Sequence, residues 1–444
     1  MAGRAVNQAA GEWDLTLTAD QWSDLSGHLF GDGDEHGAVV LAEEVAGPRG
    51  RRLLGRELIL AADGTDYVPG TTGYRALAPT FVRDAIVRAR DHRLVYLAVH
   101  NHFGTDTVGF SATDMASHER GYPALRQISG HPVGALVLTG QAAAGDLWLL
   151  GGARAELSEL LVPAGNLLRL RPRPPRVRAA GAHHDRQARL FGDLGQQTLG
   201  RMRVGVVGLG GVGSILVEAL ARLGVGHLVL IDDETVEESN LPRLLAAEHD
   251  DVGRPKTDLA ARNARRANPQ IALTVLTERA ESPAARDELS RCDWIFLAAD
   301  GHAARYWVNA TVHRYLIPAT QIGVKIPVDE DGEIGQIHAV NRLLIPGRGC
   351  LWCNGLIDPT ALAVDMHPEH ERHAADYVPG VPAPSVIALN GLVAMEAVNH
   401  FMFAVTGLHH NAHDTTSVLH LPQRRERAPQ HLRQDRACPC CSAA

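Results

Sequence analysis

The 444-residue sequence lacks the hallmarks of several protein classes. It has no internal repeat and no low-complexity tract, and its 45% hydrophobic and 21% charged residues are close to ordinary globular composition. Disorder, collagen and coiled coil are therefore poor interpretations. The two longest stretches without Asp, Glu, Lys or Arg, residues 127–145 and 377–395, are interrupted by proline, glycine and polar residues. We therefore expect no membrane partner.

An excess of positive charge is also absent. The formal net charge is -8 and the pI is about 6.3, so charge gives no reason to expect a nucleic-acid partner. The first 18 residues lack the apolar run of a secretory signal, which predicts a cytoplasmic location. In a reducing compartment the six cysteines are expected to be thiols or metal ligands.

The sequence changes character near residue 170. Residues 1–170 hold short apolar segments such as 38–41, 94–99 and 135–139, which predict an α+β domain. Residues 171–182 begin with alternating arginine and proline and predict a linker, with a basic nucleic-acid arm as the alternative. In residues 183–444, apolar strands alternate with amphipathic helices, which predicts an α/β domain with a doubly wound, mostly parallel sheet.

A glycine-rich loop follows the predicted strand at residues 203–207 and opens a predicted helix at 214–223. Such a loop lets backbone N–H groups approach a phosphate. Asp232 ends the next strand, where a carboxylate can bind a ribose hydroxyl. The pattern predicts a nucleotide site and leaves open whether the ligand is ATP or a nicotinamide cofactor. The glycines that we assign to it are Gly208, Gly210, Gly211 and Gly213.

Charged residues after Asp232 favour ATP. Arg243 and Lys256 lie on the loop and helix that flank the predicted nucleotide, where they would neutralise the charge on the β and γ phosphates. Asp300 follows the predicted strand at 294–298, at the sheet edge where a carboxylate can hold magnesium.

Four cysteines form two C-x-x-C pairs, a spacing typical of a tetrahedral zinc site. Zinc bound there would tie the end of the chain to the second domain. Cys440 is a surplus thiol that could substitute as a ligand or stay free, and Cys292 precedes a predicted strand, so both are poor thioester nucleophiles. The predicted ligands are Cys350, Cys353, Cys438 and Cys441.

A second metal motif lies in the first domain. His100 and His102 form an H-x-H pair at the end of a predicted strand, which puts both imidazoles on one side. Asp114 would complete a three-ligand zinc site with an open position for water. Ser111 and Asp114 form an S-x-x-D pattern a few residues after the H-x-H pair, at a spacing that suits such a site.

The segment from residue 186 to 353 resembles the ThiF/MoeB-type adenylating domain shared by sulfur-carrier activators and ubiquitin-activating enzymes. The motifs that carry this resemblance are Asp185-Arg186-Gln187, the glycine loop, Asp232, residues 239–243, residues 253–256 and Asp300. The resemblance implies a Rossmann-like domain with a structural zinc, in which ATP adenylates the C-terminal carboxylate of a ubiquitin-like protein.

The same resemblance implies individual roles. Asp232 would hold the ribose, Asn240, Arg243 and Lys256 the phosphates, and Asp300 the magnesium. Arg186 would reach into the partner subunit's site, so that the active form would be a homodimer. At Asp233-Glu234 the family often has an aromatic residue and an aspartate, so Glu234 is a weaker nucleotide contact.

Residues 1–170 resemble the JAB/MPN metalloprotease domain, whose JAMM signature is an upstream Glu, H-x-H and S-x-x-D. The resemblance implies that His100, His102 and Asp114 bind zinc and that Ser111 donates to an oxyanion. Glu35 best fits the general base, with Glu43 and Glu44 as runners-up. Phe103 departs from the usual proline, and the His102–Ser111 spacing is one residue longer than usual.

Together these patterns predict a bifunctional enzyme that acts on the C-terminus of one ubiquitin-like or sulfur-carrier protein. One domain would cleave a peptide or isopeptide bond after the tail, and the other would adenylate the freed carboxylate. A conjugating-type enzyme is a further candidate partner. The alternatives are sulfur-carrier activation in cofactor or cysteine biosynthesis, a nicotinamide-dependent oxidoreductase, and an inactive binding module.

Overall fold

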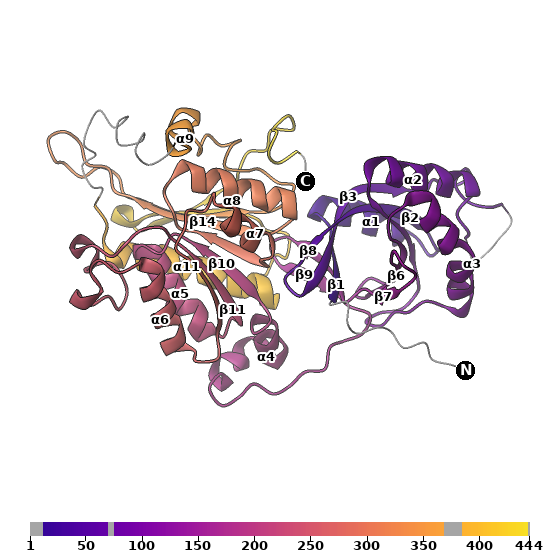
Figure 1. Ribbon diagram of the computed structural model, residues 1–444, viewed down its shortest axis with the longest axis horizontal. Coiled ribbons are helices and arrows are strands. Elements are labelled where there is room, and N and C mark those ends of the chain that lie inside the picture. The colour runs from indigo at the N-terminus through magenta and orange to yellow at the C-terminus, as the bar shows by residue number, and fades with distance from the viewer. Residues whose placement is uncertain (1–11, 70–74, 368–383, 443–444) are drawn as a thin grey trace. The chain divides into compact units, whose positions relative to one another are not determined.

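The computed structural model describes residues 12–69, 75–367 and 384–442 (Figure 1). The chain divides into two compact units. The first contains residues up to 163 and residues 168–176, and the second contains residues 164–167 and 177–444. One boundary therefore falls between residues 176 and 177, inside the expected linker.

The first unit contains three helices and nine strands in its described residues. The helices are α1 (Ala19–Leu29), α2 (Pro79–His92) and α3 (Ala112–Ser129). The strands are β1 (Glu12–Thr16), β2 (Gly37–Ala46), β3 (Gly50–Leu60), β4 (Val95–Asn101), β5 (Val133–Leu138), β6 (Ala143–Trp148), β7 (Arg154–Glu156), β8 (Glu159–Pro163) and β9 (Leu167–Leu170).

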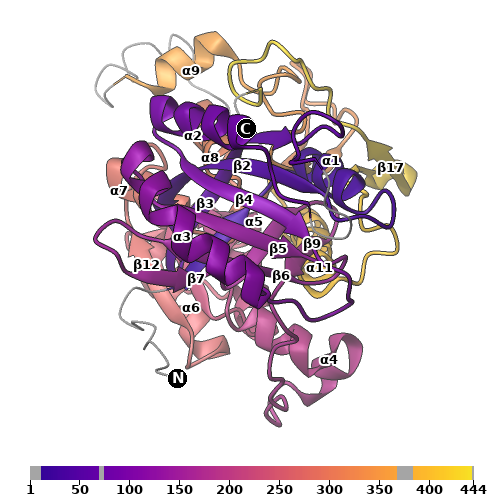
Figure 2. The ribbon, with the colours of Figure 1, turned by 90° about the vertical axis from the view of Figure 1, so that its right-hand side faces the viewer.

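The strands form one mixed sheet in the order β7-β6-β5-β4-β2-β3-β1-β8-β9. Leu25 and Leu29 of α1 pack in the core on one face, and Ile86 of α2 and Tyr122 of α3 pack on the other. Figure 2 shows α2 and α3 lying together over this sheet. β2 and β4 are antiparallel neighbours, with Gly37 opposite His100, so the start of β2 meets the end of β4.

The second unit is built on an eight-stranded sheet in the order β12-β11-β10-β13-β14-β15-β16-β17. Its strands are β10 (Arg203–Val207), β11 (His227–Ile231), β12 (Ala272–Leu276), β13 (Trp294–Leu297), β14 (Ala319–Lys325), β15 (His338–Leu344), β16 (Ser417–Leu421) and β17 (Glu426–Gln430). Strands β10 to β14 run parallel, and β15 to β17 add antiparallel pairs at one side.

Helices cover both faces of this sheet, because its central strands are apolar on both sides. One core contains residues of α4 (Asp185–Leu199), α5 (Gly211–Leu223), α6 (Lys256–Ala267) and α11 (Ile387–Thr406). The opposite core contains residues of α7 (Pro283–Ser290) and α8 (His302–Tyr315). The other helices in the described residues of this unit are α9 (Pro359–Asp365) and the short 3-10 helices η2 (Glu238–Asn240), η3 (His249–Asp251) and η4 (Pro422–Arg424).

The predicted Rossmann-like α/β fold of the second domain is confirmed, with differences at element boundaries. Helix α5 begins at Gly211 rather than at residue 214, because the glycine loop itself supplies the first turn. The 20-residue helix α11 is long and apolar enough to cross a membrane by length and composition. Its buried residues, among them Val393, Ala397 and Phe401, pack in the core of this unit, as expected of a core helix in a globular domain.

Candidate active sites

The glycine loop lies at the carboxyl end of β10. Gly208 has φ of 88°, and its backbone N–H donates to the carbonyl oxygen of Ile231 at 2.9 Å. A β-carbon at Gly208 would lie 2.5 Å from the backbone nitrogen of Ala299, so only glycine fits this close approach. Gly210 is the N-cap of α5 and uses no side-chain cap, which leaves the N–H groups of the first helical turn available to an anion.

Asp232 lies directly beside this loop. Its Oδ2 accepts a hydrogen bond from the backbone N–H of Leu209 at 2.6 Å, and its Oδ1 accepts one from Glu234 at 2.9 Å. Burial raises the pKa of Asp232, and the two N–H groups partly oppose that shift. The carboxylate is therefore fixed in orientation at the position predicted for a ribose contact.

Lys256 is the buried cation of this region, with 7% of its surface exposed. Its Nζ forms an ion pair with the exposed carboxylate of Glu234, and its backbone N–H donates to the carbonyl oxygen of Glu234 at 2.9 Å. From the sequence, Glu234 is a weaker candidate for a nucleotide contact. The structure instead gives it a contact with the lysine that was predicted to bind phosphate.

Arg243 and Asn240 belong to a loop that crosses the start of α5. The backbone N–H of Leu245 donates to Ser214 Oγ at 3.0 Å, and a β-carbon on Gly211 would lie 3.4 Å from the carbonyl oxygen of Arg243. Arg243 donates to the carbonyl oxygen of Ser239 at 2.7 Å. Asn240 is buried, and its amide nitrogen donates to Ser239 Oγ at 3.1 Å.

Asp300 and Arg186 lie in different surroundings. Asp300 is exposed and follows Ala298 and Ala299, whose backbone atoms surround Gly208, so it lies at the glycine-loop edge of the sheet. Arg186 is exposed on α4. The neighbouring Gln187 donates to the carbonyl oxygen of Leu223, at the far end of α5. The 13 residues of α5 put that end about 20 Å from the loop, so Arg186 does not join this chain's own glycine loop.

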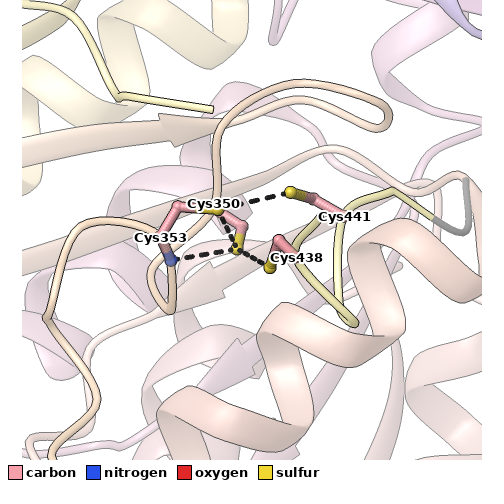
Figure 3. A group of neighbouring side chains, drawn as sticks. All are labelled: Cys350, Cys353, Cys438 and Cys441. Carbon is pink, nitrogen blue, oxygen red and sulfur yellow. Dashed lines mark hydrogen bonds between the residues drawn. The ribbon is translucent and has the colours of Figure 1, made fainter. Parts of the chain in front are cut away.

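The four predicted zinc cysteines come together although 84 residues separate the two pairs (Figure 3). The Sγ atoms of Cys350 and Cys353 are 3.6 Å apart, those of Cys350 and Cys438 are 3.7 Å apart, and those of Cys353 and Cys441 are 3.5 Å apart. A regular zinc–sulfur tetrahedron with bonds of about 2.3 Å puts sulfur atoms about 3.8 Å apart. These residues therefore fit a tetrahedral metal.

The pKa values of two of these thiols are shifted in opposite directions. Burial raises the pKa of Cys350 to about 12. Burial also acts to raise the pKa of Cys438, but backbone N–H groups of Cys440 and Cys441 outweigh it and lower the value to about 7. Without a cation, the cluster would thus hold thiols and thiolates together. A divalent metal would stabilise all four as thiolates.

The histidine pair of the first unit forms the other group that could hold a metal among the described residues. The Nε2 atoms of His100 and His102 are 3.2 Å apart, and they lie 3.6 and 3.5 Å from the carboxylate oxygens of Asp114. Tetrahedral zinc ligands with bonds of about 2.0–2.1 Å lie about 3.3–3.4 Å apart, so this donor set also fits. Both imidazoles are partly exposed, which leaves room for a further ligand.

A capping box at the start of α3 holds Asp114 in position. Ser111 Oγ accepts from the backbone N–H of Asp114 at 3.2 Å, and the Asp114 carboxylate accepts from the N–H of Ser111 at 2.7 Å. Burial acts to raise the pKa of Asp114, but hydrogen bonds with His100 and Ser111 outweigh it and lower the pKa. The Ser111 hydroxyl accepts this bond and can still donate its own proton.

The residues on either side of Glu35 are hydrogen-bonded to Asn101, which lies between His100 and His102 in the sequence. The backbone N–H of His36 donates to Asn101 Oδ1 at 2.6 Å, and Asn101 Nδ2 donates to the carbonyl oxygen of Asp34 at 3.2 Å. Asn101 separates the two histidines in sequence and is buried. It therefore fixes the loop that carries Glu35, a role that the sequence analysis missed.

The two alternative bases lie elsewhere. Glu43 is six residues beyond Gly37 along β2, which is about 20 Å at the usual strand rise. Glu43 pairs with Arg56 at 3.1 Å, and Glu44 pairs with Arg51 at 3.5 Å. The geometry therefore favours Glu35 over Glu43 and Glu44 as the candidate general base.

Asn390 of α11 is a further residue beside the glycine loop that the sequence pattern does not indicate. It is buried, its amide nitrogen donates to Ser385 Oγ at 3.1 Å, and a β-carbon on Gly211 would clash with that nitrogen. Asn390 thus packs against the first turn of α5. No local motif marks it, because the contact joins segments far apart in the sequence.

Comparisons with known proteins relate the second unit to one family. Residues 184–440 match the model of the ThiF family. A 208-residue stretch is 32% identical to the sulfur carrier protein ThiS adenylyltransferase of Escherichia coli, covering 46% of this chain and 74% of that protein. The SAMP-activating enzyme E1 of Haloferax volcanii is 32% identical over 174 residues, covering 38% of this chain and 61% of that enzyme, less than two thirds of its length.

A crystal structure of Escherichia coli MccB is similar to this chain, with a TM-score of 0.48 and 20% identity over 59% of this chain and 75% of that one. The assignment depends on the family model and the sequence relatives rather than on this likeness. Since the family model matches more than half of the sequence, the chain belongs to the ThiF family.

Proposed function

We propose that the second unit is an adenylyltransferase that uses ATP to activate the C-terminal carboxylate of a ubiquitin-like or sulfur-carrier protein. The observation that carries this proposal is the meeting of the glycine loop, Asp232 and the buried Lys256 at one sheet edge. The names of two relatives, a ThiS adenylyltransferase and a SAMP-activating enzyme, support the same chemistry.

Each residue of the proposed site has a role that suits its side chain. Asp232 holds the ribose hydroxyls, while Asn240, Arg243 and Lys256 bind the phosphates. A carboxylate oxygen of the carrier attacks the α-phosphorus, and the bond from that phosphorus to the leaving pyrophosphate breaks. Lys256 and Arg243 neutralise the charge that grows on pyrophosphate. Magnesium, for which Asp300 is the proposed ligand, would neutralise further phosphate charge when bound.

The ion pair between Lys256 and Glu234 has a consequence for ATP binding. Glu234 is largely exposed, so its carboxylate can turn into solvent when a phosphate takes its position beside Lys256. The buried lysine is thus paired in the absence of nucleotide, which avoids an uncompensated buried charge.

Four further proposals concern the second unit and the location of the protein. Arg186 acts in the partner subunit's site of a homodimer, because it lies far from this chain's own loop. The protein works in the cytoplasm, and Cys350, Cys353, Cys438 and Cys441 hold a structural zinc. Adenylation proceeds without an enzyme thioester. Cys292 is fully buried and cannot reach the adenylate, and burial raises the pKa of Cys440 to about 11, which disfavours the thiolate that would attack.

Exchange of radioactive pyrophosphate into ATP tests the adenylation proposal. The purified chain, given a candidate carrier from its gene neighbourhood, should catalyse exchange that requires the carrier's free C-terminus. Lys256→Ala should lower the exchange rate by about 100-fold or more, because it removes a cation from the leaving group. Arg265→Ala, an exposed residue of the same helix, is the matched control and should leave the rate unchanged. Exchange at the normal rate in Lys256→Ala would remove Lys256 from the mechanism.

We also propose that the first unit is a zinc-dependent peptidase of the JAMM type that cleaves after the carrier's tail. The ligand distances among His100, His102 and Asp114 support it. Zinc bound there would lower the pKa of a water molecule to about 7. Glu35 takes a proton from the attacking water, and the Ser111 hydroxyl donates to the oxygen that becomes charged.

The peptidase proposal is tested with a carrier extended beyond its natural tail. Glu35→Gln should lower the cleavage rate by at least about 100-fold while zinc content stays the same, because only the base is changed. Glu43→Gln, in β2 but away from the histidines, should cleave normally. Normal cleavage by Glu35→Gln would show that the base lies elsewhere.

The fate of the adenylate separates conjugation from sulfur transfer. A carrier recovered with a C-terminal thiocarboxylate, identified by mass, would favour sulfur-carrier activation. A carrier joined to an amine or passed to a conjugating-type enzyme would favour protein modification.

A further inference from the structure

Arg342 of β15 is a partly buried cation that neither proposed activity uses. Its Nη1 donates to Gln321 Oε1 at 2.7 Å, and within the described residues its guanidinium group forms no ion pair. Burial lowers the pKa of Arg342, and the nearby positive charge of Arg305 lowers it further. Arginine nevertheless stays charged at pH 7, and an amide oxygen carries no charge to balance it. The site therefore favours an anion.

Arg342 and Gln321 point to the face of the sheet that α8 covers. Ala319 of β14, Leu344 of β15 and Val308 of α8 belong to one core. Side chains alternate between the two faces along a strand. Gln321 comes two residues after Ala319 and therefore points to the same face. Arg342 comes two residues before Leu344 and points to that face as well. The two residues are also direct partners in the pairing of β14 with β15.

Arg305 in the first turn of α8 adds a second cation on this side of the sheet. Its Nη1 donates to the carbonyl oxygen of Leu356 at 3.1 Å. Burial lowers the pKa of Arg305, and the negative charges of Asp300 and Asp365 oppose that shift. These carboxylates thus act on Arg305, whereas the charged neighbour that acts on Arg342 is another arginine.

A ligand can reach the guanidinium group of Arg342. Its Nε and Nη2 atoms have no hydrogen-bond partner among the described residues, and neither is sealed from solvent. These two nitrogens lie on one side of the guanidinium plane, where they can bind both oxygens of a carboxylate. Lys325, four residues after Gln321 on the same face of β14, is exposed and adds positive charge.

Strand order separates Arg342 from the proposed nucleotide contacts. β13 and β14 lie between β10 and β15, so Arg342 is three strand spacings, about 14 Å, from the strand that precedes the glycine loop. Asp232 follows β11, which lies on the other side of β10. Lys256 pairs with Glu234, two residues after Asp232. Arg342 therefore lies on the side of the loop away from these contacts, which favours a contact with the carrier rather than with ATP.

We propose that Arg342 selects the carrier by binding an acidic side chain in its tail, with Gln321 holding the guanidinium in place. This inference rests on the proposed adenylation. An extended chain advances about 3.3 Å per residue, so about 14 Å corresponds to about four residues. The acidic residue therefore lies about three to five positions before the C-terminal residue, whose carboxylate is adenylated at the glycine loop.

Synthetic octapeptides of glycine and serine with a free C-terminal carboxylate and an N-terminal fluorophore are the probes. Each carries one glutamate three, four or five positions before its last residue, and matched peptides carry glutamine or lysine there. Fluorescence anisotropy measures their binding to the full chain with magnesium and a nonhydrolysable ATP analogue. At least one glutamate peptide should bind saturably, and its glutamine and lysine partners should bind at least about tenfold more weakly, because they lose the ionic hydrogen bonds.

Variants locate the contact. Arg342→Gln should weaken binding of the glutamate peptide by about tenfold or more and leave the glutamine peptide unchanged. Arg427→Gln is the matched control, because Arg427 lies on β17 of the same sheet and already pairs with Glu396 at 2.6 Å. Arg342→Glu should bind the lysine peptide in preference to the glutamate peptide, a gain that misfolding would not produce.

Any of three results in the peptide experiment would overturn the proposal: no saturable binding of a glutamate peptide, equal binding of its glutamine partner, or an unchanged preference in Arg342→Gln. Weaker ATP binding by Arg342→Gln would also overturn it, because the arginine would then bind the nucleotide. Pyrophosphate exchange with the candidate carrier keeps the two proposals apart. Normal exchange without a preference for glutamate peptides removes only the tail contact, whereas a lack of exchange removes adenylation.

Discussion

Gly208 has the strictest steric requirement in the nucleotide site. Its φ of 88° is a conformation that side chains disfavour, and its missing β-carbon would lie within 2.8 Å of the backbone of Ala298 and Ala299. Gly208→Ala should therefore destabilise the second unit by about 2 kcal/mol or more and weaken ATP binding. Urea denaturation and ATP titration measure the two effects.

The matched control is Gly391→Ala on α11, where the nearest atom to an added β-carbon is 4.0 Å away. That change should be neutral or stabilise by up to about 1 kcal/mol, since alanine favours helix. Equal stability of the two variants would mean that the loop can adjust around a methyl group.

Single residues were predictable where the signal is local. The H-x-H and C-x-x-C pairs and the glycine loop each lie in one short stretch, so the sequence could mark them as candidate sites, and the structure groups the side chains of both candidate metal sites. Asn101 and Asn390 could not be found this way. Their contacts form only when β4 meets the start of β2 and when α11 packs on α5.

At the level of elements, the cysteine cluster joins the loop after β15 to the chain's last described residues. Cys438→Ser should lower the zinc content and the melting temperature of the second unit by several degrees, because metal affinity contributes directly to folding. Cys440→Ser is the control, since Cys440 is not among the four grouped thiols. Full zinc content in Cys438→Ser, or equal loss in both variants, would contradict the assignment of Cys438 as a ligand.

The alternation of apolar and amphipathic segments predicted the parallel strands and their helices. Strands β11 and β13 do pair in parallel with β10. The antiparallel strands β15 to β17 were not predicted. Strand β17 is polar, and β15 pairs with β16 across more than 70 residues of chain, so no local pattern indicates this pairing.

At the scale of the whole molecule, buried histidines make stability depend on pH. Burial lowers the pKa of His313 from 6.5 to about 4, so the unfolded chain binds protons that the folded chain does not. The resulting contribution of His313 to the free energy of unfolding is fully present above pH 6.5 and is lost as pH falls toward 4. For the buried His313 it amounts to roughly 3 kcal/mol.

His313→Gln should therefore be less stable than the parent at pH 7 but lose less stability between pH 7 and pH 4.5. His249→Gln, an exposed histidine, should follow the parent at every pH. Urea denaturation at each pH measures this, and parallel curves for the parent and His313→Gln would contradict the shift.

The division of the chain is also a property of the whole molecule. The prolines and arginines of residues 171–182 indicated a boundary, and the structure divides the chain between residues 176 and 177. The sequence did not indicate that residues 164–167 group with the second unit, because four residues carry too little pattern to assign them.

The central claim is that both units act on the tail of one carrier protein, and intact mass spectrometry of that carrier tests it most directly. A carrier precursor with extra C-terminal residues is incubated with the full chain, zinc, magnesium and ATP. The account predicts that the carrier loses the extra residues and then gains the mass of AMP, and that Glu35→Gln blocks both changes. AMP added to the uncut precursor, or no AMP on a carrier already cut to its tail, would contradict it.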